Sequence, residues 1–136
     1  MTSSRSEELP PDLRGVPGAE ELLKWFGYWP SFHDAEVLNI HLNRHGRLHM
    51  EIETWEMTKE IDDKGHYKLR KKVVVAIALE GITACDLADF NQQNVISSLS
   101  ISKTANGYTL ALEPCYGLSG TIEAASVLIS IKQISA

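Results

Sequence analysis

The sequence predicts an α+β protein that is mainly β, with an antiparallel sheet of about six strands, curled or partly barrel-like, and one N-terminal helix. Two observations predict this class. Apolar residues recur at helical spacing only near the N-terminus, whereas after residue 34 they alternate with polar residues, as they do in strands. The chain of 136 residues is also long enough to bury a core in one domain, which we expect to span residues 18–136.

The N-terminal region divides into a lead and a helix. Residues 1–17 contain Ser, Glu, Pro and Gly with few large apolar side chains, a composition that predicts a flexible lead. From Ala19 the spacing becomes helical, and Gly27 stands where the helix should end. The apolar stripe of this helix consists of Leu22, Leu23, Trp25 and Phe26.

A β-hairpin follows, and its register can be predicted from its turn. Residues 44–46 suit a three-residue loop with Gly46 in the left-handed conformation. One face of the hairpin is then apolar and consists of three opposed pairs, Leu42 with Leu48, Ile40 with Met50, and Leu38 with Ile52. The other face is polar and pairs His41 with His49 and Asn39 with Glu51.

The third strand extends the same apolar face. Its predicted partners on the second strand are Val75 for Ile52, Ile77 for Met50 and Leu79 for Leu48. Because residues 73–79 are apolar on both sides, this strand should be central. Its small second-face residues, Val74, Ala76 and Ala78, leave room for the N-terminal helix to pack.

The C-terminal half predicts a connection and three strands. Residues 81–92 suit a connection with a helical turn at about 86–89, and alternation resumes over 95–101. Asn106 and Gly107 are a strong two-residue hairpin signal, which pairs Ile101 with Leu112 and Lys103 with Leu110. Two more strands start at Tyr108 and at about Thr121, and the last changes its apolar side near residue 125, as at a bulge.

Composition limits the classes of function. A net charge of −5 argues against general affinity for nucleic acid or for anionic membranes, both of which need clustered Lys and Arg. No apolar stretch approaches the roughly 20 residues that span a bilayer, and no signal peptide is evident, so we expect a cytoplasmic protein. Cys85 and Cys115 are too few for a disulfide framework and are predicted to be free thiols in or near the core.

No catalytic, metal or cofactor site is expected. An adjacent His33 and Asp34 suits a metal dyad only if further ligands converge on it, and of the other histidines only the opposed His41 and His49 could share an ion. We interpret that pair as solvated strand residues. A nucleophile elbow, an active-site cysteine signature and a phosphate-binding glycine loop are all missing.

The segment 29–34 is the main candidate site. It contains Trp29, Phe32, His33 and Asp34 at the junction between helix and sheet, where large aromatics either pack or bind a partner. As a structural plug, the aromatics would close the end of the sheet. As a site, they would anchor a partner while the His–Asp pair adds specificity. A second candidate docking surface is the polar face of the second strand, which carries Glu51, Glu53 and Trp55.

The run from Phe26 to Val37, with its Trp-Pro-Ser-Phe-His-Asp core, followed by strands and a Leu79-Glu80-Gly81 turn, resembles the immunity protein 50 family of bacterial polymorphic-toxin systems. The resemblance covers residues 19–131. It implies a small cytoplasmic protein that neutralises a toxin domain by direct binding, with no catalytic residue.

Two alternatives remain at this stage. In the first, the protein is a small hydrolase or ligand-binding protein that uses His33 as general base and Asp34 as its orienter. Neighbouring strand residues point to opposite faces, so this pair would have to lie in an irregular turn. In the second, edge strands join two copies into a homodimer.

Overall fold

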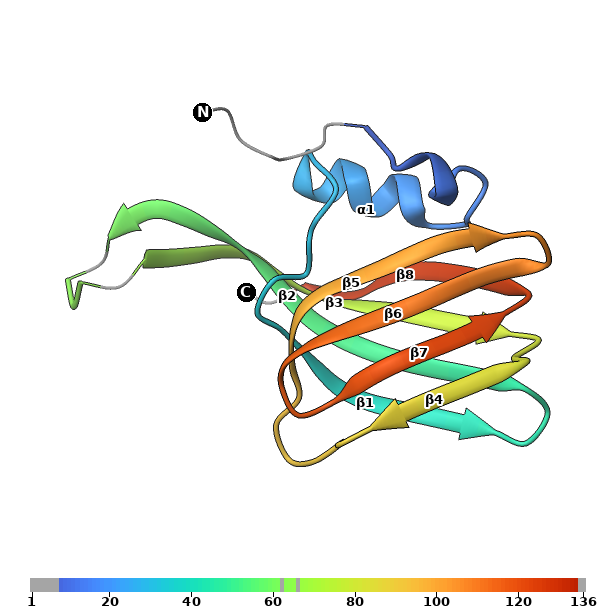
Figure 1. The fold of residues 1–136 in the computed structure, drawn as a ribbon. Coiled ribbons are helices and arrows are strands. Elements are labelled where there is room, and N and C mark those ends of the chain that lie inside the picture. Colours follow the sequence, from blue (N-terminus) through green and yellow to red (C-terminus); the bar gives the residue numbers. More distant parts are fainter. Residues whose placement is uncertain (1–7, 62, 66, 135–136) are drawn as a thin grey trace.

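The computed structural model describes residues 8–61, 63–65 and 67–134, which form one antiparallel sheet bent into two layers with a short helix beside it (Figure 1). The helical elements are a 3₁₀ turn η1 (Pro11–Leu13) and the helix α1 (Ala19–Phe26). The strands are β1 (Ala35–Asn43), β2 (Arg47–Ile61), β3 (Tyr67–Glu80), β4 (Ala84–Ala88), β5 (Val95–Thr104), β6 (Gly107–Tyr116), β7 (Ser119–Ala124) and β8 (Ser126–Ile134).

The sheet has eight strands in the order β4-β7-β6-β5-β1-β2-β3-β8, and it is not closed into a barrel. The prediction of about six strands missed β4, which lies where a connection with a helical turn was expected. It also joined β7 to β8. These two strands separate at Ala125, whose N–H donates to the carbonyl of Glu80, so that the chain leaves β6 and pairs with β3 instead.

The two layers are β4-β7-β6-β5 and β1-β2-β3-β8, and their inner faces form the core (Figure 1). They are joined where β1 pairs with β5 through only two residue pairs, Ala35 with Ile96 and Glu36 with Val95. We call these four residues the seam. Ala35 and Ile96 are fully buried, so the seam turns their side chains inward and those of Glu36 and Val95 outward.

Most of the predicted register in the first three strands is confirmed. All three predicted pairs between β2 and β3 are present, and so are four of the five between β1 and β2. The exception lies at a bulge between Val37 and Asn39, which places Val37, and not Leu38, opposite Ile52. Val37 is therefore buried, whereas Leu38 is 43% exposed.

The helix α1 ends as predicted but packs elsewhere. Gly27 caps it in the left-handed conformation, and its N–H donates to the carbonyl of Leu23 at 2.8 Å. However, α1 packs against β8 at the edge of its layer, and not over the small residues of β3. Its amphipathic face buries Leu22 and Phe26 in the core shared by the two layers. The described chain contains no helix that is long and apolar enough to cross a membrane.

A flexible lead was expected over residues 1–17; residues 1–7 lie outside the described part of the chain, and residues 8–17 contain two core residues. Leu13 and Val16 are 2% and 5% exposed and belong to the core. The carbonyl of Pro17 accepts a hydrogen bond from the N–H of Ile129 at 2.8 Å, which covers part of the free edge of β8. Two apolar side chains and backbone contacts such as this one therefore hold the segment against the sheet.

Two further predictions are wrong. The β5–β6 turn consists of Ala105 and Asn106, so Ile101 pairs with Leu110 and not with Leu112. Gly107 belongs to β6, where an added Cβ would lie 2.2 Å from the carbonyl oxygen of Ala124. Both cysteines are free but exposed, because one lies on the edge strand β4 and the other near the irregular end of β6.

Candidate functional site

The 29–34 segment connects α1 to β1 through two strained residues. Phe32 and Asp34 have φ angles of 64° and 65°, in the left-handed region that non-glycine residues rarely adopt. Phe32 is 2% exposed and Trp29 packs against the core, so both aromatics support the segment from beneath. Burial of Phe32 and a hydrogen bond from the Asp34 N–H to the Ile96 carbonyl, 2.9 Å long, hold this conformation.

The segment presents His33 and Asp34 to solvent. Their side chains are 67% and 40% exposed, and His33 Nε2 lies 3.5 Å from Asp34 Oδ2. His33 Nδ1 lies 3.2 Å from the carbonyl oxygen of Ser97 on β5. Both ring nitrogens thus lie near oxygen atoms. The irregular turn that a cooperating His–Asp pair requires is present, and it holds both side chains at the surface.

Asn94 positions the seam, a role that was not predicted from the sequence. This side chain is 2% exposed, and its Oδ1 accepts hydrogen bonds from the N–H groups of Asn91 (3.0 Å) and Leu118 (3.1 Å). Its Nδ2 donates to the Asn91 carbonyl at 2.8 Å, while its own carbonyl accepts from the Val37 N–H. The only sequence signal for this role is the polar run Asn91-Gln92-Gln93-Asn94 immediately before β5.

The predicted acidic face of β2 is largely neutralised. The Glu51 carboxylate forms an ion pair with Lys132 of β8 and accepts a hydrogen bond from Asn39 Nδ2 at 2.7 Å. These two contacts hold the pKa of Glu51 below its usual value. Glu53 lies 3.7 Å from Lys72 Nζ on β3. Because β2 is a central strand, its carboxylates reach a lysine on the adjacent β3 and another on β8 beyond it, and they do not form an acidic edge.

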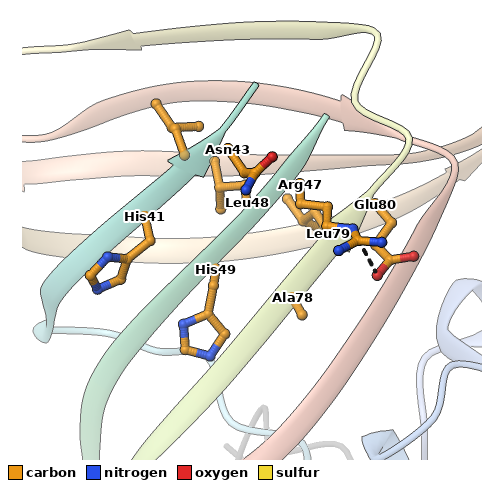
Figure 2. Close-up of a pocket in the computed structure, with 9 residues that line it drawn as sticks. His41, Asn43, Arg47, Leu48, His49, Ala78, Leu79 and Glu80 are labelled. Carbon is orange, nitrogen blue, oxygen red and sulfur yellow. Dashed lines mark ion pairs between the residues drawn. The ribbon is translucent and has the colours of Figure 1, made fainter. Parts of the chain in front are cut away.

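The opposed histidines lie at the far end of the same face (Figure 2). The ring centroids of His41 and His49 are 6.3 Å apart, and the rings border a shallow, open groove of about 280 Å³ that also includes Ala78. Arg47 and Glu80 form an ion pair beside it, 3.7 Å long. Within the described residues, no group of three or more His, Cys, Asp or Glu side chains is arranged to hold a metal ion.

Pairing between β1 and β2 brings most of the candidate residues together. Glu36 pairs with Glu53 of β2, and directly paired residues project from the same face of a sheet. Asp34 precedes Glu36 by two residues, and Trp55 follows Glu53 by two. Because the strands are antiparallel, Asp34 and Trp55 lie in the same direction from the Glu36–Glu53 pair and are close to each other. Trp55 faces outward, because Thr54 and Glu56 on either side of it are buried.

Two of the predicted site residues, Trp29 and Phe32, therefore support the surface from beneath. A third, Glu51, lies two residues before Glu53 on β2, farther from Asp34. His33, Asp34, Glu53 and Trp55 are on the surface around the start of β1.

Comparison with known proteins identifies the family. Its model, described as immunity protein 50, matches residues 18–135, a range that includes α1, the 29–34 segment and all eight strands. Comparison with curated proteins and with solved structures found no match. The family match covers nearly the whole chain and confirms the resemblance seen in the run from Phe26 to Val37. The chain belongs to the immunity protein 50 family.

Proposed function

We propose that this protein acts in the cytoplasm and neutralises a toxin domain by binding it directly, without catalysis. The proposal places His33, Asp34, Glu53 and Trp55 in contact with the toxin, whereas Trp29 and Phe32 hold the contact segment in shape. Membership of an immunity protein family supports a protein toxin as the class of partner.

The observation that carries the proposal is the exposed His33–Asp34 pair in a segment where Phe32 and Asp34 have strained backbone conformations. Each left-handed non-glycine residue costs about 1–3 kcal/mol and persists only where the surrounding structure fixes it. Here the core fixes Phe32, and β5 fixes Asp34 through its backbone N–H. Because the segment is held rigidly, His33 and Asp34 lose less conformational entropy when a partner binds.

Co-expression tests the proposal directly. The protein is produced together with the domain encoded by the gene immediately upstream, and both growth rescue and co-purification are measured. We expect the wild-type chain to restore growth and to co-purify in stoichiometric amounts. A double variant, His33→Ala with Asp34→Gly, should lose at least about tenfold in affinity, since the few central residues that dominate an interface cost about 2 kcal/mol or more each when truncated.

The matched control is Gln92→Ala, an exposed polar residue in the neighbouring loop. It should rescue growth as the wild type does. Glycine at position 34 suits the left-handed backbone, so loss of binding with an unchanged melting temperature indicates a contact and not misfolding. Failure of the wild type to bind or to protect would refute the proposal.

A further inference from the structure

We infer that the contact surface extends beyond the residues identified from sequence, across the seam to Tyr116, Glu36 and Glu113, and that it fits a basic protein surface. This inference rests on the proposed function, because it specifies which face the toxin domain covers and with what charge. Tyr116 and Glu113 lie on β6, in the layer that the proposal above does not use. The inference therefore makes the binding surface span both layers.

A continuous row of paired residues carries the extension. Val95 of β5 pairs with Glu36 across the seam, and on its other side it pairs with Tyr116. Because Glu36 also pairs with Glu53, four adjacent strands contribute one outward residue each to the row. Tyr116 is 58% exposed, which is unusual for a large aromatic residue at a fixed strand position.

Glu113 lies beside the row and close to the His33 segment. It pairs with Ser98 of β5, and its carbonyl accepts a hydrogen bond from Ser97 Oγ at 3.3 Å. The Ser97 carbonyl faces His33 Nδ1, so Ser97 contacts both the 29–34 segment and Glu113. An aromatic residue thus stands among carboxylates at the junction of the layers, which is the composition of an interface anchor surrounded by polar contacts.

The charge distribution identifies the partner as basic. Residues 81–126 contain four carboxylates and a single cation, Lys103, and so carry a net charge of −3 out of −5 for the whole chain. Lys103 lies seven residues from Ile96 along β5, roughly 20 Å from the seam. Among the described residues, neither Glu36 nor Glu113 has Lys or Arg at ion-pair distance, in contrast to Glu51 and Glu53. A cationic surface would complement these carboxylates.

Binding kinetics against the purified upstream-encoded domain test the inference. Association and dissociation rates are measured at 50 mM and 500 mM NaCl for the wild type, for a Glu36→Gln and Glu113→Gln double variant, and for Tyr116→Ser. We expect the double variant to associate about tenfold more slowly at low salt, with the difference largely gone at high salt. Tyr116→Ser should dissociate at least about tenfold faster.

Two matched controls distinguish loss of contacts at the proposed surface from the general effect of removing a charge or an exposed apolar side chain. Glu123→Gln removes an exposed carboxylate from the outer face of the same layer, roughly 20 Å from Tyr116, and Leu128→Ser removes an exposed apolar residue from β8. Both should bind within about twofold of the wild type. If the seam variants match the wild type, or if Glu123→Gln slows association as much as the double variant, the inference is refuted while the proposed function stands. If the wild type does not bind this domain, both are refuted.

Discussion

Replacing Asn94 by alanine should destabilise the protein more than any exposed substitution near the seam. The side chain is 2% exposed and forms three hydrogen bonds, two through Oδ1 and one through Nδ2. One of the donors it satisfies is the backbone N–H of Leu118, a residue that is fully buried. Alanine removes all three bonds and leaves that donor without a replacement.

The magnitude follows from these contacts. Three hydrogen bonds at about 1 kcal/mol each amount to about 3 kcal/mol, and a buried donor left unsatisfied can add about 1 kcal/mol or more. We therefore expect the free energy of unfolding to fall by about 3–4 kcal/mol. Domains of this size are stable by about 5–15 kcal/mol, so the variant should still fold, with a melting temperature lower by about 10 °C.

Urea denaturation followed by circular dichroism measures this loss. The midpoint should fall while the slope of free energy against urea stays unchanged, because the surface exposed on unfolding is the same. Gln92→Ala, in the same loop but exposed, serves as the control and should change stability by no more than about 0.5 kcal/mol. A loss below about 1 kcal/mol for Asn94→Ala would show that the Asn91–Leu118 contacts do not stabilise the fold, and the assigned role of Asn94 would be wrong.

Three further predictions concern strain, pH and packing. Asp34→Gly should be more stable than Asp34→Ala by about 1 kcal/mol in urea denaturation, since alanine pays the left-handed penalty at φ 65° and glycine does not; equal stabilities would contradict the strain. The pKa of Glu51 is lowered in the folded state by Lys132 and then by Asn39, so its contribution is present above the usual value of 4.5 and is lost as pH falls through the lower, folded pKa. Denaturation of wild type and Glu51→Gln should therefore differ at pH 7 and converge at low pH, and a constant difference would argue against this assignment. Gly18→Ala should greatly reduce the melting temperature or prevent folding, because its Cβ would lie 1.5 Å from the Ile129 carbonyl oxygen. Gly15→Ala is the control: Gly15 has nearly the same φ but open space around it, so the free energy of unfolding should fall by only about 1 kcal/mol. Similar losses of stability in the two variants would mean that the backbone at β8 moves easily to accommodate the methyl group.

The sequence predicted correctly those parts of the fold that depend on turns and on alternation of apolar and polar residues within neighbouring segments. The three-residue turn at Gly46 fixed the β1–β2 register, and alternation then carried the same apolar face from β2 to β3. The prediction failed at two irregular positions. Leu38 is exposed because of a bulge between Val37 and Asn39, and Gly107, which was expected in the turn, lies in β6 close to the backbone of Ala124. Neither feature has a signature in the nearby sequence.

The candidate site shows the same division. The 29–34 segment stands out in sequence because aromatic residues, proline and a His–Asp pair are adjacent. Tyr116 and Glu113 approach it only because β5 pairs with β1 at the start of both strands, a long-range pairing that no turn signal predicts. The ion pairs of Glu51 and Glu53 were not predicted either, since their lysine partners come from β8 and β3.

The two residue pairs of the seam make it the least cooperative junction in the sheet. Every other neighbouring pair of strands is joined by at least five residue pairs, so local opening, in which backbone hydrogen bonds break while the shared core stays packed, should begin at the seam. A partner that covers the seam would bind only the closed form and would therefore oppose this opening. Amide hydrogen exchange should then slow in both layers on binding, including strands far from the contact, so that one small interface stabilises the whole protein.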